Sequence, residues 1–60
     1  MKDECEVAVG DIVFDFVAYS HALVIGVSKY DDSVMEVLLL DGDRHGDVEL
    51  ASVADLKVIK

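Results

Sequence analysis

The sequence predicts a small all-β domain made of five short strands. Its 60 residues are enough for one domain only, which we expect to span 1–60, with 1–8 as an acidic lead-in. Hydrophobic residues make up 53% of the chain, and valine and isoleucine, which favour strands, are prominent among them. These residues fall into short runs separated by glycine or aspartate, which is the pattern of strands joined by turns.

A first strand is predicted from Asp11 to Tyr19. Because successive side chains of a strand point to opposite faces, this stretch divides into two sets. The set that contains both phenylalanines is expected to face the core: Ile12, Phe14, Phe16 and Ala18. The remaining set is expected to face outward: Val13, Asp15, Val17 and Tyr19.

Two further strands are predicted over 22–29 and 34–40. Gly26 lies inside the first of them, where glycine often marks a bulge or a sharp bend. Asp31 and Asp32 lie between the two strands and predict a hairpin turn. Alternation places Leu23, Ile25 and Val27 on one face of the first strand, and Met35, Val37 and Leu39 on one face of the second.

A second hairpin is predicted after these strands, because Asp41-Gly42 is a strong turn signal. The fourth strand is expected over 47–51, with Val48 and Leu50 inward and Asp47 and Glu49 outward. Residues 52–56 suit one 3₁₀ turn, and Val58-Ile59 closes a short fifth strand.

This plan resembles that of a small SH3-like barrel, which has five short strands and a 3₁₀ turn before the last. The residues that carry the resemblance are Gly10-Asp11-Ile12-Val13, Gly26, Asp41-Gly42 and the closing Asp55-Leu56-Lys57-Val58-Ile59. KOW and Tudor domains open in a similar way, and many small bacteriophage proteins share the outline. The resemblance implies a five-stranded barrel, and the KOW likeness implies contact with RNA or with the transcription or translation machinery.

The charge of the chain limits its partners. Thirteen acidic and five basic residues give a net charge of −8, which argues against direct binding to nucleic acid or to anionic membranes. A basic protein partner remains compatible with this charge. We expect a cytoplasmic protein, in the host cytoplasm or the virion if a phage encodes it. Residues 1–6 resemble no signal peptide, no apolar run reaches ~20 residues, and Cys5 has no second cysteine to pair with.

The loop from Asp41 to Asp47 contains the only candidate metal ligands: Asp41, Asp43, His45 and Asp47. Carboxylates at a spacing of two, followed by a glycine at the sixth position, resemble the start of a calcium-binding loop. However, His45 stands where calcium requires an oxygen ligand, and Ser52 stands where the bidentate acid belongs. The sequence therefore favours a polar hairpin loop, and we expect no metal and no other cofactor.

Catalytic residues are not predicted, and we expect that the protein is not an enzyme. The serines lie in turns or at strand ends and form no nucleophile elbow. Asp3, Glu4 and Glu6 surround Cys5 and disfavour its thiolate, which is the reactive form.

The surplus of apolar residues indicates an interaction surface on the outward strand faces. The residues expected to form it are Val13, Val17, Val24, Leu38 and Leu40. Contiguous exposed apolar patches mark protein interfaces. The leading hypothesis is therefore a non-enzymatic protein–protein interaction module: a homo-oligomer, a phage-type assembly subunit or a protein that binds a host factor. The alternative is a KOW-like module acting on transcription or translation machinery, or an acidic mimic of nucleic acid.

Overall fold

The structure is a computed structural model that describes residues 7–59. It contains five strands: β1 (Ile12–Asp15), β2 (Ser20–Val27), β3 (Val34–Leu39), β4 (Val48–Ser52) and β5 (Leu56–Val58). One 3₁₀ turn, η1 (Val53–Asp55), directly precedes β5. The prediction of an all-β domain with five strands and a 3₁₀ turn before the last is confirmed. None of the helical segments within residues 7–59 has the length and hydropathy to cross a membrane.

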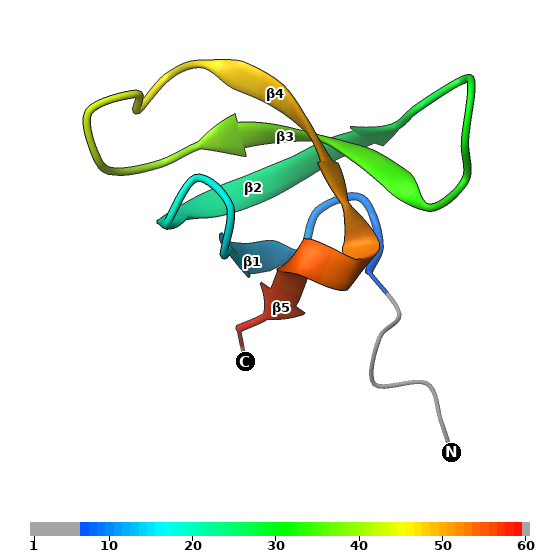
Figure 1. Cartoon of the computed structure of the whole chain (residues 1–60), viewed down its shortest axis with the longest axis horizontal. Helices are drawn as coiled ribbons and strands as arrows, with labels where there is room; N and C mark the ends of the chain where they lie inside the picture. Colours follow the sequence, from blue (N-terminus) through cyan, green and yellow to red (C-terminus); the bar gives the residue numbers. More distant parts are fainter. Residues whose placement is uncertain (1–6, 60) are drawn as a thin grey trace.

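The strands form one antiparallel sheet in the order β4-β3-β2-β1-β5 (Figure 1). Both edge strands come from the C-terminal part of the chain, and η1 carries the chain from β4 at one edge to β5 at the other. Because only three residues separate them, β4 and β5 follow one another around a corner and do not pair side by side. The sheet is compatible with a small barrel-like fold, although it is not closed.

The core is small and rich in valine. Among residues 7–59, nine hydrophobic residues are buried in it: Val7, Val13, Ala22, Val24, Met35, Val37, Leu39, Ala51 and Leu56. The central strands supply most of them, whereas β4 and β5 supply one each. A domain of this size buries only about 60% of its unfolded surface, so its stability rests on a few side chains.

The first strand is shorter than predicted because Asp15 ends it. The Oδ1 atom of Asp15 accepts hydrogen bonds from the backbone N–H groups of Val17, at 2.9 Å, and Ala18, at 3.2 Å. An aspartate that bonds the backbone two residues ahead stabilises a turn. Residues 16–19 consequently form the turn into β2, where the sequence had predicted continued strand.

The inward face of β1 is also the opposite of the one predicted. Val13 and Asp15 are buried, whereas the Phe16 side chain is 56% exposed and Phe14 is half-buried. Val13 lies opposite Ala22 of β2 and Val58 of β5; Val13 and Ala22 belong to the buried core, and Val58 packs against it.

The second strand contains the predicted irregularity. Its pairing with β3 shifts register between Val24 and Gly26, which places a bulge at Ile25. A Cβ atom on Gly26 would lie 3.0 Å from the Oε1 atom of Glu36, so a larger residue here would have to displace the end of the Glu36 side chain.

Candidate interaction surface

The outer face of the sheet carries an apolar row that crosses four neighbouring strands. Ile12 pairs with Leu23, Leu23 with Leu38, and Leu38 with Val48. Residues directly opposite one another in antiparallel strands point to the same face, so these side chains adjoin. Ile12 and Val48 at the ends are exposed, and the two leucines between them are half-buried. We call these four residues the outer row.

Phe14 lies at the centre of an aromatic cluster at the β1 end of this face. Its ring makes edge-to-face contacts with Phe16, Tyr19 and His21, at centroid distances of 5.1, 5.4 and 5.1 Å. Such contacts contribute about 0.5–1.5 kcal/mol each beyond the area that they bury. Lys57 of β5 lies opposite Phe14 on its other side. The cluster therefore extends the apolar surface with rings that are already held in place.

The five residues predicted to form the surface are not brought together by the structure. Val13 and Val24 are fully buried in the core, so the prediction that they are exposed is wrong. Val17 lies in the turn before β2 and is 76% exposed, and Leu40 is exposed just after β3. Of the five, only Leu38 belongs to the outer row. For Val17, Leu38 and Leu40, which are exposed or half-buried, an interaction role stays a prediction.

Sequence reasoning missed Ile12, Leu23 and Val48 because it chose the wrong faces of β1, β2 and β4. The period of two was correct in β1, in β4 and in β2 up to its bulge, but its phase was reversed. A signal for the correct phase in β1 was present in Asp15 itself, because an aspartate side chain can bond the backbone two residues ahead and so end a strand in a turn. Once Asp15 faces inward, alternation places Val13 inward and Phe14 outward.

A cleft with a volume of about 530 Å³ separates the turn after β1 from the loop after β3. It is lined by Val17, Ala18, Tyr19, Ser20, Leu39, Asp41, Gly42, Asp43 and Arg44. Ser20 is 4% exposed, and its hydroxyl has no hydrogen-bond partner among residues 7–59. Gly42 lies over this serine, since a Cβ atom built on the glycine would lie 3.6 Å from that of Ser20. The loop thus covers the Ser20 hydroxyl, which makes no hydrogen bond to any residue in 7–59.

The candidate metal ligands make other contacts. Asp41 accepts hydrogen bonds from the backbone N–H of His21, at 2.9 Å, and lies 2.7 Å from the ring Nδ1 of the same residue. The Nδ1 atom of His45 lies 3.0 Å from the carbonyl oxygen of Gly42. Within the part of the chain that the structure describes, no three acidic, histidine or cysteine side chains converge on one point. Cys5 lies outside the described residues.

Hydrogen bonding lowers the pKa of two surface aspartates. The pKa of Asp41 is lowered by its hydrogen bonds with the ring and then the backbone of His21. The pKa of Asp31 is lowered by hydrogen bonds from the backbone and the hydroxyl of Ser33. Both contacts join neighbouring strands or close a turn, so these carboxylates stabilise hairpins.

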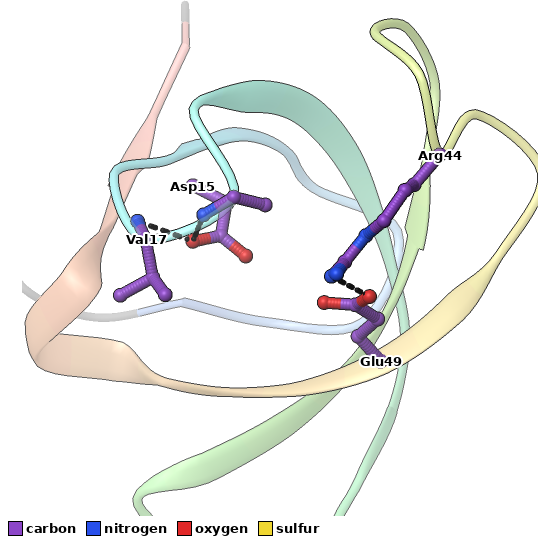
Figure 2. A network of polar contacts seen from close by, with 5 residues as sticks. Asp15, Val17, Arg44 and Glu49 are labelled. Carbon is purple, nitrogen blue, oxygen red and sulfur yellow. Dashed lines mark hydrogen bonds and ion pairs between the residues drawn. The ribbon is translucent and has the colours of Figure 1, made fainter.

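Figure 2 shows two polar contacts that fix the loops around the cleft. Asp15 holds the backbone nitrogen of Val17 in the first turn, and Arg44 forms an ion pair with Glu49 of β4. The ion pair spans the β3–β4 hairpin and turns the half-buried Glu49 carboxylate towards the loop. Both contacts stabilise local structure.

Comparisons with protein-family models, with curated proteins and with solved structures find no match to this chain. The role of the outer row is therefore inferred from its apolar side chains and from the charge of the chain.

Proposed function

We propose that this protein is a non-enzymatic interaction module whose outer sheet face binds a basic protein. The observation that carries the proposal is the outer row, an unbroken line of apolar side chains on one face of four paired strands. Contiguous apolar surface of this kind is typical of protein interfaces. The Phe14 cluster enlarges it with aromatic rings, which are enriched in interface centres.

The charge of the chain supports a basic partner. The net charge is −8, and the outer face itself carries Glu36 beside Leu50. A partner with an apolar centre and a rim of lysine or arginine would bury the outer row and meet acidic residues around it. Complementary charge would chiefly accelerate association and select the partner.

A more specific form of the proposal follows from the resemblance to small SH3-like bacteriophage proteins. It assigns the chain to virion assembly or to the binding of a host factor. Either role requires a protein partner and no catalysed reaction. Both are therefore consistent with an exposed apolar face on a small domain.

The proposal is tested with a labelled synthetic peptide of alternating leucine and lysine, which combines an apolar face with positive charge. Fluorescence anisotropy should show binding, and Ile12→Asp should weaken it about tenfold or more, the loss of roughly 1.4 kcal/mol. Val9→Asp is the matched control, because Val9 is exposed outside the strands. Equal binding by both variants, or equal binding of a leucine–glutamate peptide, would contradict the proposal.

A further inference from the structure

Within residues 7–59, one edge of β4 carries backbone groups that pair with no other strand. The N–H of Leu39 donates to the carbonyl of Asp47 at 2.9 Å, and the N–H of Val53 donates to the carbonyl of Ser33 at 2.8 Å. Antiparallel partners alternate between hydrogen-bonded and non-bonded pairs. Residues 47, 49, 51 and 53 therefore bond to β3, and the backbone groups of Val48 and Leu50 point away from it.

Glu49 points inward from this short edge strand, but the edge lacks the other common features that prevent strands from pairing. The segment Val48–Ser52 contains no proline and no lysine, and its register with β3 is regular throughout. Val48 is 57% exposed and Leu50 is 62% exposed. Among residues 7–59 no other strand pairs with this side of β4. An exposed, regular and apolar edge is a template for another strand.

We propose that β4 pairs antiparallel with β4 of a second copy, with Leu50 opposite Leu50, so that one sheet runs through a two-fold dimer. This pairing satisfies the N–H and C=O groups of Leu50 in both copies. It also brings the two exposed leucines together as a cross-strand pair on the outer face. The proposal does not depend on the basic partner proposed above.

Charge selects the register of this self-pairing. With Leu50 opposite Leu50, Glu49 of one copy faces Ala51 of the other, and Asp47 faces Val53. The register with Val48 opposite Leu50 would place Glu49 against Glu49, and the register with Val48 opposite Val48 would place Glu49 against Asp47. Like charges directly opposite one another are destabilising. The edge is thus complementary to itself in one register.

Two substitutions at Leu50 separate backbone pairing from simple apolar contact. Leu50→Pro removes the outward N–H and places a ring on the free edge, while the bonds between β3 and β4 do not use that N–H. Leu50→Thr keeps the N–H and a strand-forming side chain. We expect the wild type to dimerise, Leu50→Thr to dimerise more weakly, and Leu50→Pro to stay monomeric.

Sedimentation velocity measures the mass of each variant at about 0.1 M and 1 M salt, between which the Debye length falls from roughly 10 Å to 3 Å. Because each copy carries a net charge of −8, the dimer should strengthen as salt rises. A wild type that stays monomeric at high salt, or a Leu50→Pro variant that dimerises equally well, overturns the proposal. If the wild type stays monomeric, a strand of another protein would be the better candidate to pair with this edge.

Hydrogen exchange provides a measurement that does not depend on the folding of any variant. In the wild type, the amide of Leu50 should exchange more slowly as protein concentration rises. The amide of Glu49 is the internal control, because it already bonds to β3 in each copy. Protection of Leu50 that does not change with concentration would overturn the proposal.

Discussion

Strands β3 and β4 are neighbours, and both have alternating apolar residues. This alternation predicts the buried face correctly in β3 but not in β4. In β3 the expected set of Met35, Val37 and Leu39 is buried. In β4 the expected set of Val48 and Leu50 is exposed, so that prediction is wrong. The residues that face inward there are Glu49, half-buried, and Ala51, buried.

The difference arises from the position of each strand in the sheet. Strand β3 lies between two partners, and its larger apolar face has to be buried. Strand β4 is an edge, and its register is set by β3: Val37 lies opposite Glu49 and Met35 opposite Ala51. The limited inner space accepts the small Ala51, and Arg44 supplies a partner for Glu49. Hydrophobicity alone therefore predicts the inward face of a central strand better than that of an edge strand.

Removing leucine side chains from the two strands should give the largest contrast. Leu39 is among the largest fully buried side chains, so Leu39→Ala should lower the free energy of unfolding by about 3 kcal/mol. Leu50→Ala, an equal change on β4, should cost less than about 0.5 kcal/mol in the monomer. Urea denaturation measures both, and equal losses would remove the distinction between the strands.

The buried polar residue Asp15 should show the next largest effect. Asp15→Ala removes the acceptor for two backbone N–H groups and should cost about 2 kcal/mol. Asp15→Asn retains an oxygen at the same position and is the matched control. The two variants should differ clearly in thermal unfolding. If they are equally stable, the turn after β1 is held by something other than this side chain.

Ser20 should respond in the opposite direction, because its buried hydroxyl has no hydrogen-bond partner in the described part of the chain. Ser20→Ala removes this unsatisfied group and should raise the free energy of unfolding by roughly 1 kcal/mol. Ser52→Ala is the comparison, since the Ser52 hydroxyl accepts a hydrogen bond from the N–H of Ala54 and its loss should destabilise. A destabilised Ser20→Ala protein would show that the hydroxyl does form a favourable contact.

The smallest effect is expected from acid. The pKa of Asp41 is lowered in the folded protein by its hydrogen bonds with His21, below its ordinary value of 3.8. Its contribution is therefore complete above the unfolded pKa and is lost as pH falls through the lower folded pKa. Asp41→Asn should destabilise the protein near neutral pH, and this difference should shrink below about pH 4. Urea midpoints at the two pH values measure it, and a difference that stays constant would contradict the linkage.

The sequence was sufficient to predict the strand order along the chain, both hairpins, the bulge at Gly26 and the 3₁₀ turn. These features depend on local signals such as Asp41-Gly42, which act within a few residues. It was not sufficient to predict which face of β1 or β4 is buried, because that depends on the residues of neighbouring strands. The outer row could not be predicted for the same reason, because Ile12, Leu23 and Val48 become neighbours only through the register of the paired strands.

The pairing of β1 with β5 determines how the domain would respond to mechanical force. The two strands are antiparallel, and the carbonyl of Ile12 at the start of β1 accepts from the N–H of Ile59, just beyond β5, at 2.8 Å. Tension applied between them would load this bond first and then the others in sequence, because the bonds run perpendicular to the strands. Such unzipping needs less force than shearing, so β5 should peel away before the paired strands β2 and β3 separate.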